Sequence, residues 1–140
     1  MADIRETKKC VVVVDGDLPV GLMVNAAACL AITLGDRVES INGDDATDGS
    51  EMVHPGLIPT GIAILQADAD TIKKIRMKAE RTEGVFVANF TDAAQTPRNY
   101  GEYLKNISKI ASEDLKYLGV GLYGDKKPVG KLTGGLALLR

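Results

Sequence analysis

A run of four consecutive valines constrains this chain more than any other feature of its sequence. The valines end the segment Cys10–Val14, and Asp15 and Gly16 follow them directly. β-Branched side chains favour extended backbone, and a run without polar alternation is typical of a strand that is buried on both faces. The sequence therefore predicts a central strand in a sheet that is covered on both sides.

The next segment, Leu22–Leu34, is almost wholly apolar and carries one amide, Asn25. It is too long for a strand and rich in Ala and Leu, which favours a buried helix that Gly35 would end. Two interpretations of Asn25 stay open, because an unsatisfied amide costs about 1–3 kcal/mol. Its side chain either makes a structural hydrogen bond to the neighbouring loop or presents a donor and an acceptor at the mouth between strand and helix.

Strands and helices are predicted to alternate along the rest of the chain. The predicted strands are Gly61–Leu65, Val85–Phe90 and Leu118–Tyr123. Two helices are predicted, one from Asp68 or Asp70 to about Arg81 and one over Asn99–Leu115. This alternation predicts one α/β domain over residues 1–140, with helices on both faces of the sheet.

The inner faces of these two helices follow from the spacing of their apolar residues. The residues predicted to face inward are Ile72, Ile75 and Ala79 in the first helix, and Tyr103, Leu104, Ile107 and Ile110 in the second. The lysines of Asp125–Pro128 are predicted to lie in a turn after the last strand.

Residues 37–60 form a long excursion, for which a short hairpin is predicted. Loops of this length inside compact domains are usually functional or mobile. The acidic cluster Asp44–Gly49 does not match a calcium-binding loop, because Ala46 and Pro55 stand where carboxylate ligands belong. A solvated turn is the better interpretation.

The charge of the chain is divided unevenly. Its net charge is −2, but residues 1–70 carry −8 and residues 71–140 carry +6. The sharper interpretation is a basic surface built from the C-terminal half that attracts an anion, and the simpler one is ordinary solvated faces. The acidic total argues against avid binding of tRNA or DNA.

Membrane association and secretion are not predicted. No apolar run reaches the roughly 18–20 residues of a membrane span, and Met1–Lys9 lacks the apolar core of a secretory signal. With two cysteines, both in apolar segments, we expect reduced thiols and a cytoplasmic location.

No cofactor and no metal are predicted. The segment Gly119–Gly124 spells a dinucleotide-binding fingerprint, but its glycines lie inside a predicted strand, where close packing or a bulge explains them better. No cysteine pair has the spacing of metal ligands, and His54 is the sole histidine. His54 is a candidate acid or base, although a surface role is favoured.

Asp92 and Thr96 follow the third predicted strand. If that strand runs parallel to the first, they share a sheet edge with Asp15, Asp17 and the head of the first helix, where α/β folds place ligands. A carboxylate and a hydroxyl there would orient a water or a polar ligand. Alternatively, Asp92 caps the next turn.

Three segments resemble the archaeal and eukaryotic type of peptidyl-tRNA hydrolase: Lys9–Cys29, Ile64–Thr96 and Leu118–Leu139. The resemblance implies a three-layer α/β/α sandwich with a four-stranded mixed sheet, and often a homodimer. It implies catalytic roles for Asp92 and Thr96. The lysine-bearing head of the family's first helix is replaced here by Gly21–Val24. This replacement removes the cations that would steer a phosphate-bearing substrate.

A bacterial family known as the domain of unknown function number two thousand is the closer resemblance and shares this fold. Its pattern is similar at Asn25, Asp48, Gly49, His54, Gly56, Tyr100, Gly119, Val120 and Gly124. No activity is established for that family, so this resemblance implies the fold and leaves the function open.

We therefore predict a cytoplasmic α/β protein that binds a small polar ligand at the C-terminal edge of the sheet. The predicted substrate-binding residues are Asn25, Asp17 and Gly21. If the protein is an enzyme, we expect hydrolysis of an ester or amide, with catalytic residues Asp92, Thr96 and His54. Residual peptidyl-tRNA hydrolase activity and a non-catalytic dimeric adaptor are the alternatives.

Overall fold

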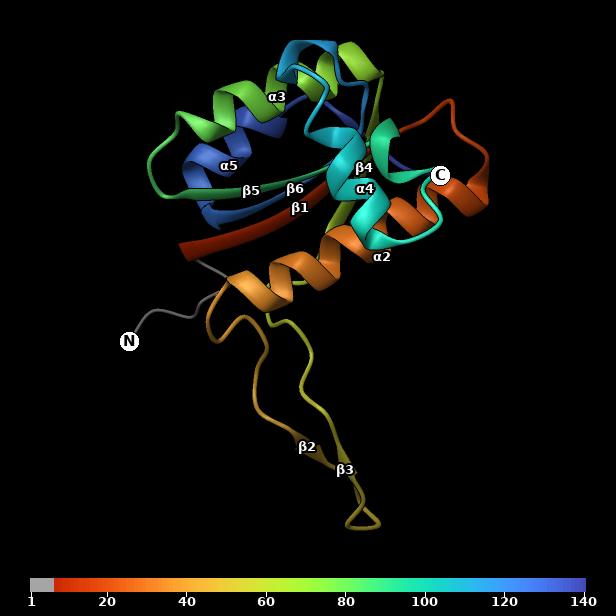
Figure 1. Cartoon of the computed structure of the whole chain (residues 1–140). Coiled ribbons are helices and arrows are strands. Elements are labelled where there is room, and N and C mark those ends of the chain that lie inside the picture. The colour runs from red at the N-terminus through yellow and green to blue at the C-terminus, as the bar shows by residue number, and fades with distance from the viewer. Residues whose placement is uncertain (1–6) are drawn as a thin grey trace.

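A five-stranded mixed sheet forms the centre of the protein in the computed structural model, which describes residues 7–140 (Figure 1). The strand order is β5-β6-β1-β4-β7. Strand β1 (Lys8–Asp15) pairs in parallel with β4 (Ala63–Ala67) and antiparallel with β6 (Tyr117–Asp125). The edge strands, β5 (Val85–Thr91) and β7 (Ala137–Leu138), each pair antiparallel with their neighbour.

The prediction of four strands is wrong by one. Strand β7 has two residues, too few to show the alternation by which a strand is recognised in a sequence. It forms because the chain after helix α5 (Lys126–Thr133) returns along β4, where Leu138 lies opposite Leu65. Most of Met1–Lys9, for which we predicted the absence of a secretory signal, lies outside the described residues.

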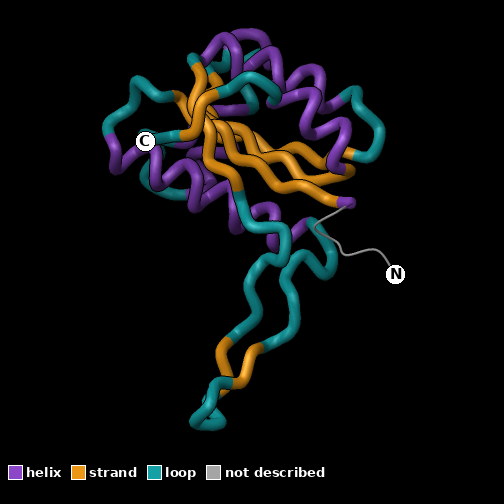
Figure 2. Tube along the Cα trace, turned by 180° about the vertical axis from the view of Figure 1, so that it is seen from behind, coloured by secondary structure: helices purple, strands orange, loops and turns teal. Residues whose placement is uncertain are grey.

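Helices cover both faces of the sheet (Figure 2). Val11 and Val13 pack against α3 (Ala69–Glu80) and α5 (Lys126–Thr133), whereas Val12 and Val14 pack against α2 (Val20–Arg37). All four valines are fully buried, so the prediction of a strand with two covered faces is confirmed. The buried residues of α3 are those predicted, Ile72, Ile75 and Ala79.

Close packing explains the glycines of β6. A Cβ atom on Gly119 would lie 3.1 Å from Cδ1 of Leu30, and one on Gly121 would lie 3.2 Å from Cδ1 of Leu34. Both leucines belong to α2, so the glycines allow this helix to approach the sheet. All three glycines of the rejected fingerprint lie within the strand.

Helix α2 is buried along one face only. Its buried residues are Met23, Ala26, Leu30 and Leu34. On the outer side, Val20, Val24 and Ile32 are 70%, 60% and 74% exposed. The helix runs through Gly35 and has 18 residues with a mean hydropathy of 1.3, which meets the length and composition of a membrane span. Its packing against the sheet makes it a layer of the core.

Two predicted elements differ from the structure. The predicted helix Asn99–Leu115 is two short pieces, α4 (Tyr100–Ile107) and the 3-10 turn η2 (Ser112–Asp114). Helix α4 has no buried residue, and Leu104 is 51% exposed, because α4 lies beside the end of β5 and does not pack across the sheet. The predicted turn at Asp125–Pro128 begins α5. Pro128 lies in the first helical turn, where its missing N–H breaks no helical bond.

Residues 42–57, which we call the arm, project away from the sheet (Figures 1 and 2). The predicted hairpin is confirmed, with β2 (Ala46–Thr47) paired antiparallel to β3 (Val53–His54). Asp48 closes its end: Oδ1 accepts the backbone N–H groups of Ser50 and Met52, and Oδ2 lies 2.8 Å from Nε2 of His54. These bonds hold the acidic cluster in a defined turn.

Candidate functional site

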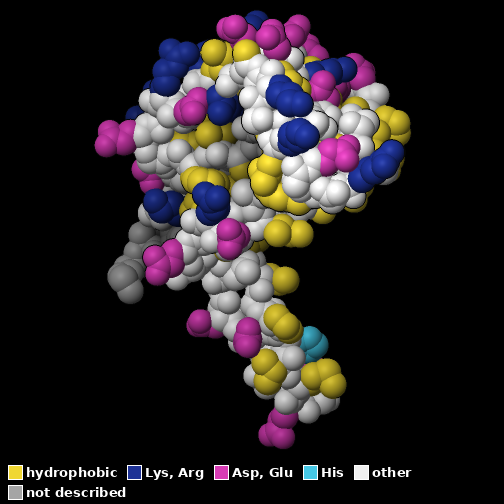
Figure 3. Space-filling view, in the orientation of Figure 1, with side chains coloured by type: hydrophobic (Ala, Val, Ile, Leu, Met, Phe, Trp, Pro, Cys, Tyr) yellow, Lys and Arg dark blue, Asp and Glu magenta, His cyan; other side chains and the backbone are white. Residues whose placement is uncertain are grey.

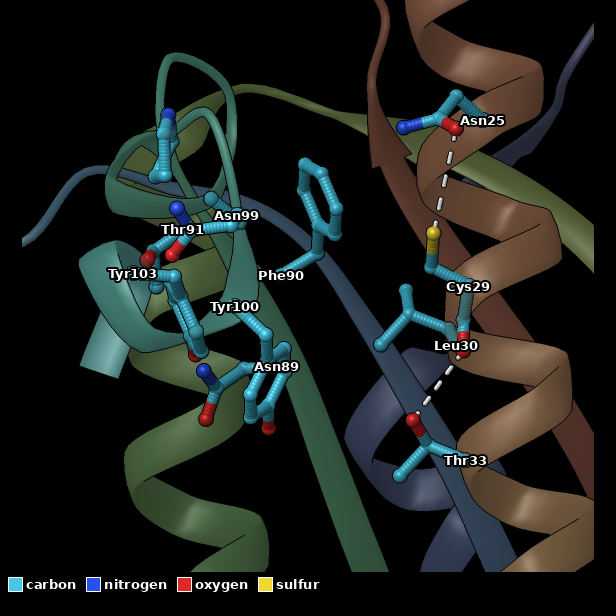
Figure 4. Close-up of a pocket in the computed structure, with 12 residues that line it drawn as sticks. Asn25, Cys29, Leu30, Thr33, Asn89, Phe90, Thr91, Asn99, Tyr100 and Tyr103 are labelled. Atoms are coloured by element: carbon cyan, nitrogen blue, oxygen red, sulfur yellow. Dashed lines mark hydrogen bonds between the residues drawn. The ribbon is translucent and has the colours of Figure 1, made fainter.

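A pocket of about 370 Å³ lies between α2 and the end of β5, where the chain continues into α4 (Figure 4). Helix α2 contributes one wall, and β5 with the chain that follows it into α4 contributes the other. The lining residues are Asn25, Cys29, Leu30, Thr33, Asn89, Phe90, Thr91, Ala94, Pro97, Asn99, Tyr100 and Tyr103. Its volume lies in the range of small-molecule sites. None of these side chains carries a formal charge at neutral pH.

One residue that lines this pocket, Thr91, has a buried hydroxyl without a hydrogen-bond partner. Thr91 is the last residue of β5 and is 2% exposed. Its Oγ1 is the one buried side-chain oxygen or nitrogen among residues 7–140 that has no partner. Leaving such a group unsatisfied costs about 1–3 kcal/mol, which a ligand in the pocket would relieve.

The free polar groups of the pocket are mainly donors. Oδ1 of Asn89 accepts from Nε of Arg76 at 3.4 Å, and Oδ1 of Asn99 accepts the backbone N–H of Glu102 at 2.8 Å. Oδ1 of Asn25 is 3.9 Å from Sγ of Cys29, a weak contact within one helical turn. The side-chain N–H group of Asn25 stays available and suits an oxygen atom of a ligand, whereas the Asn89 side chain is directed toward Arg76 of α3 and away from α2.

Two tyrosines form the outer part of the pocket wall. The rings of Tyr100 and Tyr103 have centroids 5.3 Å apart and are tilted by 54°. Burial, with a smaller contribution from Tyr100, raises the pKa of Tyr103 above its usual value. Tyr103 therefore stays protonated at neutral pH and offers a hydroxyl donor and a flat apolar surface.

Of the predicted site residues, Asn25 lines this pocket. The condition placed on Asp92 is met, because β1 and β5 both run antiparallel to β6 and therefore parallel to each other. Asp92 is nevertheless exposed, and its Oδ1 accepts the backbone N–H of Lys116 at 3.3 Å. Thr96 is exposed between the lining residues Ala94 and Pro97. Neither Asp92 nor Thr96 lines the pocket.

The other predicted residues lie elsewhere. His54 is on the arm, which points away from the pocket, and its partner is Asp48 (Figure 1). Asp17 lines a hollow of about 180 Å³ beside β4, and its backbone N–H donates to Asp15. Gly21 is exposed in the first turn of α2. The structure therefore does not bring the six predicted residues together around one cavity.

Metal binding finds no support among residues 7–140, in which no three His, Cys, Asp or Glu side chains are grouped to hold an ion.

The two thiols differ in environment. Cys10 is buried in β1, and this burial raises its pKa to about 11, whereas Cys29 is exposed beside the pocket. A thiol is a poor nucleophile until it ionises, so Cys10 is inert at neutral pH.

The comparisons with known proteins agree on the fold. Residues 8–140 match a family described as a protein of unknown function, DUF2000. The chain belongs to this family. A solved protein of unknown function, Atu0240 from Agrobacterium tumefaciens strain C58, is similar with a TM-score of 0.83 and 22% identity over 94% of this chain and 96% of that one. At this identity the likeness shows the fold alone. No curated protein matches.

The residues that carry the resemblance to DUF2000 divide into two groups. In the first, geometry explains the residue type: a Cβ on Gly56 would lie 1.9 Å from the carbonyl oxygen of Gly43, and one on Gly124 would lie 2.1 Å from that of Gly84. In the second, Asn25 and Tyr100 line the pocket from opposite walls. In this DUF2000 chain, the second group has no evident structural task.

Sequence reasoning missed most of the pocket. Thr91 reads as the polar end of a strand, and Asn89 as an ordinary strand residue. The tyrosines were expected to face the core or to carry only the family resemblance. The available signal was the density of uncharged polar side chains from Asn89 to Asn99, which follows a strand end, where ligands bind in α/β folds.

Proposed function

We propose that this protein binds a small, uncharged polar ligand in the pocket between α2 and β5. The observation that carries the proposal is the buried hydroxyl of Thr91, which has no partner and belongs to a residue that lines a pocket of ligand size. The free N–H group of Asn25 would bind an oxygen atom of the ligand. Tyr100 and Tyr103 would pack against its flat or apolar side.

The absence of charge in the lining argues for the class of ligand. Phosphates and carboxylates are usually bound by Arg, Lys or helix N-termini, and no Arg or Lys lines this pocket. Neutral donors and aromatic rings instead suit nucleosides, sugars and amides. The wall from α2 and the wall from β5 can both contact one such molecule.

The test is a thermal-shift screen of neutral nucleosides, monosaccharides and primary amides, followed by titration of any compound that raises the melting temperature. We expect the shift in melting temperature to disappear in Thr91→Val. In Asn25→Ala the affinity for the ligand should fall about tenfold or more, since each variant loses a hydrogen bond to the ligand. Asn42→Ala is the control, because Asn42 lies outside the pocket. Equal shifts in all three variants would place the ligand elsewhere.

Cys29 provides a second measurement on the same site. Its thiol is exposed and lines the pocket, so a bound compound should slow its reaction with iodoacetamide, followed by mass spectrometry. Cys10 is the internal control, since it is 2% exposed and stays unmodified until the protein unfolds. A compound that shifts the melting temperature and leaves the Cys29 rate unchanged does not occupy this pocket.

Hydrolysis of an ester or amide by Asp92, Thr96 and His54 stays a prediction. Residual peptidyl-tRNA hydrolase activity also stays a prediction, and so does the peptidyl-tRNA hydrolase-like fold that the resemblance implies. Asp92 and Thr96 are close in sequence to the pocket wall, which is the support for a reaction there. Release of peptide from peptidyl-tRNA at the rate of a no-enzyme control would exclude the hydrolase activity.

A dimeric adaptor is the second candidate, favoured by the outer face of α2. Val24, Ala28 and Ile32 recur every fourth residue on this face, and the helix has no charged residue before Asp36. A second copy of the same uncharged helix is the partner that fits it, in an isologous contact. Light scattering should then report a dimer that Ile32→Asp converts to a monomer. A monomeric wild-type protein would exclude this candidate.

A further inference from the structure

A second hollow lies on the opposite face of the sheet from the ligand pocket. It has a volume of about 390 Å³ and runs between α3 and the segment from α5 to β7. The residues that line it are Thr71, Lys74, Ile75, Lys78, Lys131, Leu132, Gly134 and Leu136. We call it the lysine groove.

The floor of the lysine groove is apolar. Ile75 is 6% exposed and belongs to the main core cluster, and Leu132 and Leu136 are half-buried against that cluster. The groove therefore continues the hydrophobic core to the surface. An apolar guest that covered these three side chains would remove their remaining surface from water.

The rim of the groove is positively charged. Lys74 and Lys78 lie one turn apart on α3, and Lys131 faces them from α5. No acidic residue lines the groove. Within residues 7–140, no ion pair includes Lys78 or Lys131. Lys74 is different, because its charge contributes to the lowered pKa of Asp68. The uncompensated charge thus comes mainly from Lys78 and Lys131.

We propose that the lysine groove binds a single-chain anionic amphiphile, of which a medium-chain fatty carboxylate is the simplest example. The chain would lie on Ile75, Leu132 and Leu136, and the carboxylate would lie between Lys78 and Lys131. An inorganic anion would leave the apolar floor uncovered, and a neutral lipid would leave the lysines without partners. Charge and apolar surface together select a molecule that has both.

The test is calorimetric titration of the full chain with hexanoate, octanoate and decanoate at low salt and below their micelle concentrations. We expect saturable binding with one site, and an affinity that rises about fourfold for each methylene buried. Lys78→Gln/Lys131→Gln should weaken decanoate at least tenfold. Lys105→Gln/Lys126→Gln removes two exposed lysines outside the groove and should bind as the wild type does.

Decanol separates the contributions of head and tail without a substitution that endangers folding. It should bind more weakly than decanoate to the wild type, and this difference should vanish in Lys78→Gln/Lys131→Gln. The proposal is overturned if decanoate does not saturate by about 1 mM, or if both lysine double variants bind it equally. A concentration-dependent dimer that only Lys78→Gln/Lys131→Gln abolishes would overturn it too, by identifying the occupant as a second copy.

This site is independent of the proposed ligand pocket, from which the sheet separates it. Thr91→Val should therefore leave decanoate binding unchanged. Loss of decanoate binding in that variant would mean that the carboxylate occupies the pocket between α2 and β5, and it would overturn the assignment to the lysine groove.

Discussion

Thr91 combines full burial with a hydroxyl that has no hydrogen-bond partner. Its side chain is as inaccessible as the valines of β1, yet its hydroxyl has no partner. Thr133 is the useful comparison, because it is buried to a similar degree and its Oγ1 donates to the carbonyl oxygen of Val129 at 2.9 Å. The two threonines differ in hydrogen bonding and not in burial.

Replacing Thr91 by valine should therefore stabilise the ligand-free protein. Valine has nearly the same shape and removes the unsatisfied hydroxyl, so we expect the free energy of unfolding to rise by about 1 kcal/mol. Thr133→Val removes a satisfied hydroxyl and should be neutral or lower it by about 1 kcal/mol. Urea denaturation of both variants measures the difference. Destabilisation by Thr91→Val would mean that its hydroxyl is bonded in solution.

At the scale of elements, β5 and β6 approach each other so closely at Gly124 that no room is left for a side chain there. Gly124 lies opposite Val85, and the carbonyl oxygen of Gly84 occupies the space where its Cβ would stand. Gly35, in contrast, has nothing within 4 Å of its Cβ position in α2. Replacing glycine by alanine would therefore meet a filled space at Gly124 and an open one at Gly35.

Gly124→Ala and Gly35→Ala should change stability in opposite directions. At Gly124 the strands must move apart, which costs roughly 1–3 kcal/mol by analogy with an overpacked core. At Gly35 the added methyl raises helix propensity, which stabilises by roughly 0.5–1 kcal/mol. Thermal denaturation followed by circular dichroism distinguishes the two. A neutral Gly124→Ala would show that the start of β5 is loosely held.

The arm carries its own pH dependence through Asp48. Hydrogen bonds from His54 first, and then from the backbone of Met52 and Ser50, lower the pKa of Asp48 below its usual 3.8. A carboxyl whose folded pKa is depressed stabilises the folded form above its unfolded pKa, and this stabilisation is lost as the pH falls through the folded value. The turn should therefore be intact from neutral pH down to about 4 and open in stronger acid.

NMR chemical shifts of Ser50 and Met52 between pH 6 and pH 2 measure this opening. In Asp48→Asn the turn should already be loosened at neutral pH, because the charged acceptor is gone. Asp44→Asn is the matched control, since the Asp44 side chain makes no hydrogen bond within residues 7–140. Identical behaviour of both variants would mean that Asp48 does not hold the turn.

For the whole molecule, the sequence predicted the burial of an element correctly where the pattern of that one segment requires a core beside it. The valines of β1 and the apolar spacing of α3 predicted buried elements correctly, since each pattern needs a core beside it. The same reasoning failed for α4, which has an apolar stripe but lies beside the sheet edge with no core to cover. Periodicity identifies the face that a helix could bury, but it does not show whether another element packs against that face.

The candidate site was less accessible to sequence reasoning, because it depends on distance between elements. Asn25 was recognised from its conflict with an apolar helix. Thr91 gave no such signal, since the lack of a partner for its hydroxyl arises only when the folded chain buries it. His54 was selected for its chemistry alone, and its position on the arm follows from a hairpin whose direction no local pattern encodes.

The arm and the sheet should be separable units of the molecule, and space-filling views show the arm standing clear of the rest (Figure 3). None of its residues belongs to a core cluster, whereas Ile41, just outside it, belongs to one and Ile58 packs against that cluster. The backbone N–H of Gly43 donates to the carbonyl of Leu57 at 2.8 Å, so the two ends already lie side by side. An Asn-Gly turn in place of residues 44–56 can therefore close the chain without strain.

This shortened protein should keep the fold, with a free energy of unfolding within about 0.5 kcal/mol of the wild type, because the lost residues bury nothing in the sheet. It should also bind the same neutral compound with the same affinity, since no arm residue lines the pocket. Denaturation and calorimetric titration test both statements. If the protein proves to hydrolyse that compound, the rate in the shortened form decides whether His54 takes part: an unchanged rate excludes it, and a lost rate with intact binding requires the arm to reach the site.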